Sequence, residues 1–192
     1  MEIMGKNNIN SNKKDIDCEN KATDIKDVRV FFEKQLERTN TWLDFAEAKS
    51  AGLIVANIAL IGVVENFFLY APVFTVITVA LALLSSLCCL LTFLPNLENS
   101  SKSGTDKINN NPNLIYFGDI SKFETADYYV SLVANSYFGN ESSLEKDGYI
   151  HDLATEIIIN SQITMKKYDL FYKALRIDWI AFVMIVATFI AA

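Results

Sequence analysis

The sequence is poor in the residues that build most catalytic and metal sites. It has one histidine, His151, and three cysteines, of which Cys88 and Cys89 lie inside an apolar run. This supports neither a histidine-rich zinc site nor a Ser-His-Asp relay, and it is not a disulfide framework. The seven glycines are scattered and form no phosphate-binding loop, and HExxH, GxSxG and CxxC motifs are absent. We therefore predict no enzymatic activity, no metal site and no cofactor.

Basic charge is also scarce. Lysine and arginine total 17 against 23 acidic residues, which gives a net charge of −6. Without a basic excess, no nucleic-acid partner is expected. The first twenty residues are polar and lack an apolar core, so we expect no cleavable signal peptide.

Apolar residues, in contrast, are concentrated in three uncharged runs, 51–64, 73–94 and 179–192. At about 1.5 Å per residue, 73–94 extends roughly 33 Å and can cross a bilayer core of about 30 Å. The first run becomes long enough if residues 45–50 enter the interface. We predict an antiparallel transmembrane helical hairpin over 50–95. The third run predicts a C-terminal transmembrane helix over 177–192, or a helix that lies against the hairpin without crossing.

Lysine and arginine positions predict the topology. They precede the first and third runs and are missing from the hairpin tip between Glu65 and Pro72. Cations flanking spans are retained on the cytoplasmic side. The chain is therefore expected to be a multi-pass protein of a bacterial inner membrane, with the lipid bilayer as a partner and the N-terminus in the cytoplasm.

Small and polar residues recur at helical spacing within the runs. Asn57 lies in the middle of the first run, and the others form stripes on the first run (Gly52, Ala56, Ala59) and on the second (Thr78, Ala82, Ser85, Cys89, Thr92). Such faces let helices approach closely in lipid, and a buried amide seeks a polar partner. The stripes favour either packing within the hairpin or assembly into a homo-oligomer.

The polar segments complete an all-α membrane protein. Residues 1–24 are rich in Asn, Lys and Asp and are expected to be a disordered tail, and 25–49 form a cytoplasmic helix leading into the first span. A linker over 96–113 precedes a small cytoplasmic helical module over 114–176. In this module, the spacing of Ser121 and Glu124 predicts a helix start near Lys122, and Gly139 is expected to end that helix.

Cations and aromatic residues gather before the third run. A nucleotide could be held there by phosphate pairing and base stacking, with Lys166, Lys167, Tyr168 and Lys173 as the candidate ligands. The alternative is that these cations only face anionic lipid and set the topology.

Three stretches resemble the Pycsar effector family, the bacterial transmembrane effectors of cyclic-pyrimidine antiphage defence. They are WLDFAEAKSAGLIVANIALIG, NLIYFGDISKFETADYYVSL and HDLATEIIINSQITMKKYDLFYKAL. The first differs from the usual F-A-D-x-K-A pattern at Glu47 and Ser50. The second keeps the run from Tyr116 to Ile120, and the third keeps a scattered set (Asp152, Ile157, Ser161, Lys167, Tyr168). The likeness covers about residues 25–190.

The resemblance implies a function that the residue patterns alone do not. A partner cyclase would make cyclic CMP (cCMP) or cyclic UMP (cUMP) during phage infection. The effector would bind this messenger, impair the inner membrane and stop the infected cell by abortive infection. The residue patterns alone also fit a non-catalytic membrane scaffold that anchors a cytoplasmic partner.

Overall fold

A computed structural model of the chain describes residues 3–94, 111–139 and 147–191. These residues contain helices and turns and no strand, which confirms the all-α prediction. The α-helices are α1 (Ile3–Val64), α2 (Pro72–Leu90), α3 (Phe117–Ile120), α4 (Ala126–Val133) and α5 (Gly148–Ala191). Short 3-10 turns follow α1 (Glu65–Phe67) and α2 (Leu91–Phe93), and a π-helical turn (Ala134–Phe138) follows α4.

The chain divides into two compact units. The α3–α4 unit comprises residues 1–38 and 101–159, and the α2 unit comprises residues 39–100 and 160–192. The long helices α1 and α5 contribute residues to both units.

The α3–α4 unit has an aromatic and aliphatic core. Phe32 of α1 packs edge-to-face against Tyr129 of α4, with ring centroids 5.7 Å apart, and both side chains are fully buried. The remaining core residues come from α1, the α3 segment, α4 and α5 (Val28, Ile120, Phe123, Val133, Ile150, Ile157). The Tyr129 hydroxyl donates to the Leu114 carbonyl at 2.8 Å, so its burial leaves no unsatisfied donor. Burial also raises the Tyr129 pKa far above its ordinary value.

The segment leading into α3 is held by side-chain to backbone hydrogen bonds. The Asn113 side-chain oxygen accepts the N–H groups of Ile115 and Tyr116 at 3.0 and 3.2 Å. Gln35 of α1 is buried and donates to the Ile115 carbonyl at 2.8 Å. Gly118 lies so close to the Tyr116 ring that an added Cβ would collide with it. A larger residue at position 118 would require the exposed Tyr116 ring to move.

The predicted helix start near Lys122 is wrong. The helix begins at Ala126, and the residue before it, Thr125, has extended backbone angles. The Ser121 hydroxyl does not cap a following helix, because it donates to the Gly118 carbonyl at the end of α3. Gly139 ends the helical segment after α4 as predicted, with a left-handed φ of 67° that favours glycine.

The predicted disordered tail also differs from the structure, in which α1 begins at Ile3. Residues 3–24 include a single glycine and no proline, so the backbone chemistry permits a continuous helix.

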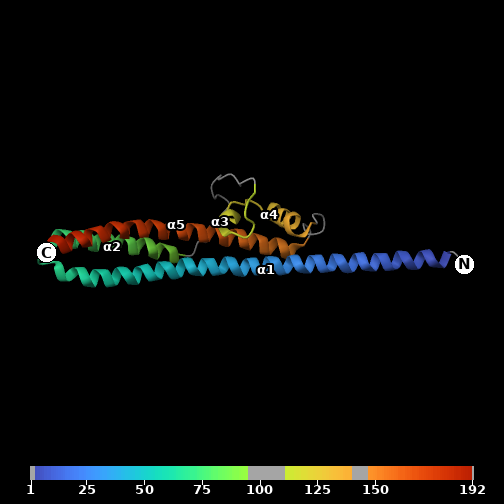
Figure 1. Ribbon diagram of the computed structural model, residues 1–192, viewed down its shortest axis with the longest axis horizontal. Helices are drawn as coiled ribbons and strands as arrows, with labels where there is room; N and C mark the ends of the chain where they lie inside the picture. The colour runs from blue at the N-terminus through green and yellow to red at the C-terminus, as the bar shows by residue number, and fades with distance from the viewer. Residues whose placement is uncertain (1–2, 95–110, 140–146, 192) are drawn as a thin grey trace. The chain divides into compact units, whose positions relative to one another are not determined.

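The α2 unit combines the second part of α1, α2 and the second part of α5, which Figure 1 shows alongside one another. Pro72 occupies the first turn of α2 as expected. The buried face of α2 is small and polar (Thr75, Thr78, Ala82, Ser85, Cys89), whereas its exposed face is made of large apolar residues (Val73, Val76, Leu83, Leu87, Leu90). This is the reverse of the burial pattern of a helix in water.

Two helical segments are long and apolar enough to cross a membrane. They are Ile25–Phe67 and Pro72–Phe93. This agrees with the two predicted spans and is compatible with a membrane protein. Residues 179–191 of the third run belong to α5 and are not one of these segments among the described residues, so the crossing of this run stays a prediction.

Candidate functional site

The candidate ligand Lys167 is buried and already has a partner. Its side chain is 11% exposed, and its ammonium group forms an ion pair with Glu47 of α1. Removing one partner from a buried pair leaves an uncompensated charge. In this structure Lys167 therefore holds α5 against α1 within the α2 unit.

The next residue, Tyr168, also contacts α1, through a lysine that lies against its ring. The Lys49 ammonium lies 4.9 Å from the centroid of the Tyr168 ring and 3.5 Å from its hydroxyl. Glu47 and Lys49 of α1 thus contact two successive residues of α5. We call these four residues the clamp. They come from two stretches that are distant in the sequence, 42–62 and 151–175, and the fold brings them together.

The other two candidate ligands lie apart from the clamp contacts. Lys166 is exposed. Lys173 is also exposed and pairs with Asp169 one turn earlier on α5 at 2.6 Å. Further along, the Arg176 guanidinium stacks over the Tyr172 ring at 4.7 Å.

A polar cluster joins the three helices of the α2 unit. The Asn57 amide donates to the Ser85 hydroxyl at 3.2 Å, and Ser85 donates to the Ala174 carbonyl at 3.2 Å. Asn57 and Ser85 are both buried. The amide in the middle of the first run therefore has a partner on α2 of the same chain.

Asp178 lies beside this cluster and was not among the predicted site residues. Asn57 and Ser85 are its polar neighbours. Both carboxylate oxygens of Asp178 are buried, and neither has a hydrogen-bond partner among the described residues. The available sequence signal was an acidic residue at the start of an otherwise uncharged apolar run.

The remaining assembly candidates divide into two groups. Thr78 and Cys89 are fully buried within the unit, and the Thr78 hydroxyl donates to the Phe74 carbonyl of its own helix at 2.9 Å. Gly52 is exposed, and nothing lies within 4 Å of the place a Cβ would occupy. The structure thus uses Asn57, Thr78, Ser85 and Cys89 inside one chain and leaves Gly52 on its surface.

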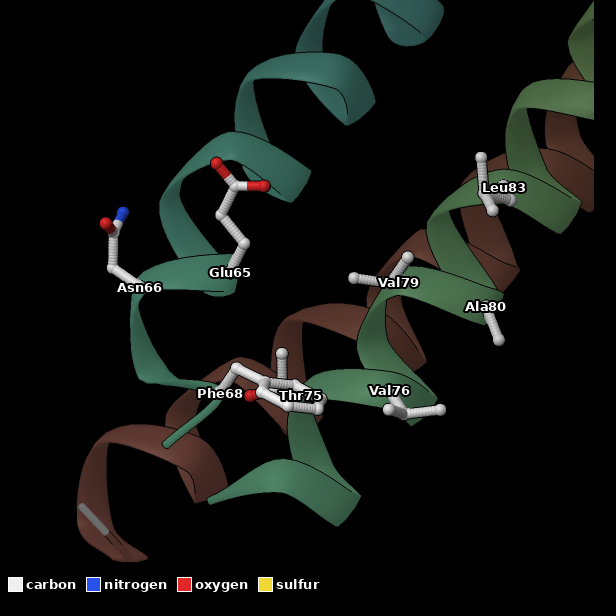
Figure 2. Close-up of a pocket in the computed structure, with 8 residues that line it drawn as sticks. All are labelled: Glu65, Asn66, Phe68, Thr75, Val76, Val79, Ala80 and Leu83. Atoms are coloured by element: carbon white, nitrogen blue, oxygen red, sulfur yellow. The ribbon is translucent and has the colours of Figure 1, made fainter. Parts of the chain in front are cut away.

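Figure 2 shows a cavity between the end of α1 and the start of α2, with a volume of about 740 Å³. Its polar lining includes Glu65, Asn66 and Thr75, and its apolar lining comes from Phe68 and α2 (Val76, Val79, Ala80, Leu83). The Thr75 hydroxyl is buried without a hydrogen-bond partner among the described residues.

A polar network on the α3–α4 unit fixes the start of α5. Arg29 of α1 donates to Asp147 at 2.7 and 2.9 Å, and Tyr149 donates to Glu33 at 3.0 Å. Burial raises the pKa of Asp147, but the hydrogen bond and charge of Arg29 and backbone N–H donors outweigh it, so the pKa lies below its ordinary value. His151 lies 3.5 Å from Asp127. No group of three or more His, Cys, Asp or Glu in the described parts of the chain is arranged to hold a metal ion.

A family model and a curated relative both relate this chain to the Pycsar effectors. The family model described as PycTM, Pycsar effector protein domain, matches residues 31–192. The curated Pycsar effector protein RsPycTM from a Rhizobium species is 28% identical over 134 residues, which is 66% of this chain and 74% of the relative. No solved structure matches. The family match includes all four clamp residues and Asp178.

Proposed function

This chain belongs to the PycTM family of Pycsar effectors, a family of antiviral defence and cyclic-nucleotide signalling, and we propose that it is the membrane effector of an abortive-infection system. In this proposal, a partner cyclase makes cCMP or cUMP, the effector binds it, and the activated effector impairs the inner membrane. The effector is not an enzyme and needs no cofactor besides the messenger.

The observation that carries the membrane part of this proposal is the burial pattern of the α2 unit. Small and polar side chains are enclosed between its helices, and large apolar side chains face outward on α2 and α5 (Leu83, Leu87, Leu90, Phe182, Val183, Val186). Exposing so many large apolar groups to water is unfavourable, whereas lipid solvates them. This supports insertion of α1 and α2 as a transmembrane hairpin. The lysines and arginines that precede the first and third apolar runs, and their absence from the hairpin tip, favour a tip outside and an N-terminus in the cytoplasm. We extend the proposal to a third crossing by the end of α5.

The clamp supports a role in messenger binding. A cyclic nucleotide carries one phosphate anion and one base. An anionic phosphate can replace the Glu47 carboxylate as the partner of Lys167, and an aromatic ring such as Tyr168 can stack on a pyrimidine.

Messenger binding at the clamp can be coupled to the membrane segments if the messenger has different affinities for two arrangements of the helices. A ligand that binds better to the arrangement in which Lys167 has left Glu47 shifts the population toward that arrangement. Because α1 and α5 carry the clamp and also carry Asn57 and Ala174, a change at the clamp is connected through both helices to the polar cluster with Ser85. The exposed stripe around Gly52 is available for assembly into a homo-oligomer.

The test uses the full-length protein purified in detergent. Calorimetry with cCMP, cUMP and cyclic AMP should detect binding of one cyclic pyrimidine and none of the purine control. Liposomes that contain the protein should then release a trapped dye only when this messenger is added. Failure to bind either pyrimidine would contradict the proposal and favour the scaffold alternative.

A further inference from the structure

Asp178 is a buried carboxyl group at the start of an apolar run, and it has no ion-pair partner among the described residues. It lies on the inner face of α5, between Ala174 and Ala181, which are both almost fully buried. Both carboxylate oxygens are buried and lack a hydrogen-bond partner in the described parts of the chain. A charged group at membrane depth is costly, and such residues face a water-filled space or an ion pathway.

Asn57 and Ser85 lie beside the Asp178 carboxylate and are uncharged, so they can ease its burial but cannot neutralise it. The hydrogen bonds described for Asn57 and Ser85 go to Ser85 and Ala174. The nearest cations along α5 are also engaged, because Lys173 pairs with Asp169 and Arg176 stacks on Tyr172.

Asp178 also lines a surface pocket. A cavity of about 260 Å³ is lined by Asp178 together with Leu175, Trp179 and Phe182. The other three lining residues are apolar, so Asp178 is the one charged residue in its wall. The Asp178 oxygens are buried in this structure, so an ion would reach them only after the helices rearrange on activation.

The charges of the predicted spans all have one sign. Residues 50–94 and 177–192 contain no lysine or arginine, and their only charged residues are Glu65 and Asp178. Glu65 lines the larger cavity, and Asp178 lines the smaller one. Acidic side chains along a pore attract cations and repel anions, especially in a low-dielectric surrounding.

We propose that the activated effector conducts small inorganic cations such as K⁺ and Na⁺ in preference to anions, and that Asp178 sets this preference. The inference rests on the proposed membrane-impairing function and deepens it by naming the permeant class. Asp178 is the selectivity residue because, of these two acids, it is the one that lies beside the polar cluster joining the three helices.

The experiment measures ion selectivity in liposomes that contain the full-length protein and a KCl gradient, after addition of cCMP and, separately, of cUMP. Wild type should show K⁺ permeability above Cl⁻ permeability. Asp178→Asn, which keeps the shape and removes the charge, should lose this preference severalfold while still leaking. Asp178→Glu should retain the preference. Asp152→Asn is the matched control, because its side chain is 86% exposed and belongs to the α3–α4 unit.

The outcomes separate this inference from the proposed function. A leak with equal K⁺ and Cl⁻ permeability in wild type, or an unchanged preference in Asp178→Asn, would overturn the role of Asp178 and leave the membrane effector intact. No messenger-dependent leak at all would overturn both.

Discussion

Lys167 of α5 is held by Glu47 of α1 in an ion pair that is largely closed to solvent on the lysine side. Lys167 was predicted as a ligand contact, and the pair gives it a specific resting partner. A messenger phosphate would have to compete with Glu47 for this ammonium group. The resting state would then be stabilised by the same contact that activation breaks.

Replacing Glu47 with glutamine should tighten messenger binding and weaken the resting structure. Glutamine keeps the shape but does not compete with phosphate for Lys167. The loss of stability should be smaller than the roughly 3–5 kcal/mol typical of a fully buried pair, because the Glu47 side chain is 40% exposed. Calorimetry with the messenger and thermal unfolding in detergent measure the two effects.

Lys167→Ala should bind messenger more weakly than wild type, and Glu47→Gln in the Lys167→Ala background should add little. This double-mutant comparison separates a shared contact from two independent losses. If Lys167→Ala binds the messenger as tightly as wild type, the ligand-contact role of Lys167 is refuted. Glu156→Gln provides a control on α5 in the α3–α4 unit.

Tyr168 is expected to act through its ring. Tyr168→Phe keeps an aromatic face over Lys49 and should bind messenger nearly as wild type, whereas Tyr168→Ala should lose both stacking and the cation–π contact. A base stacked on an aromatic ring contributes about 1–3 kcal/mol, which corresponds to at least a severalfold loss of affinity. Equal affinity of the two variants would argue against stacking. The same calorimetric titration provides the measurement.

The sequence predicted the helices and the small-polar stripe because both depend on periodicity. Thr78, Ser85 and Cys89 recur at the spacing of one helix face, and the structure buries all three. Run lengths likewise predicted the two membrane-competent segments. Local rules failed where a side chain had two possible uses. Ser121 matches a capping box, but it bonds back to Gly118, and the helix starts at Ala126 rather than near Lys122.

Contacts between distant segments could not be predicted from spacing. Lys167 and Glu47 are 120 residues apart, and either could have faced solvent. Asp178 looked like the polar flank of an apolar run until α5 was packed against Asn57 and Ser85. Gln35 gave no signal, because its buried bond to the Ile115 carbonyl depends on the path of a loop.

Asp147 should make the α3–α4 unit sensitive to acid. Its pKa is lower in the folded state than in the unfolded state, so its stabilising contribution is present above the ordinary pKa of 3.8 and is lost as the pH falls through the lower folded value. Asp147→Asn should lower the thermal midpoint at pH 7 and flatten its decline below about pH 4. Asp152→Asn, with an exposed carboxyl group, is the control. Parallel declines in wild type and Asp147→Asn would contradict the assignment.

Ser85 is the connecting residue of the polar cluster, because it accepts from Asn57 and donates to Ala174. Ser85→Leu places a larger side chain at a fully buried position and removes both bonds. Overpacking of this kind costs about 1–3 kcal/mol and separates the three helices. We expect normal membrane insertion, since leucine is more apolar than serine, but reduced toxicity when the messenger is present. Growth after induction and the membrane fraction on immunoblots measure these effects.

Ser86→Leu is the matched control, because the neighbouring Ser86 is only partly buried and donates to the Ala82 carbonyl of its own helix at 2.8 Å. If Ser85→Leu remains as toxic as Ser86→Leu at equal membrane abundance, the polar cluster takes no part in the membrane damage.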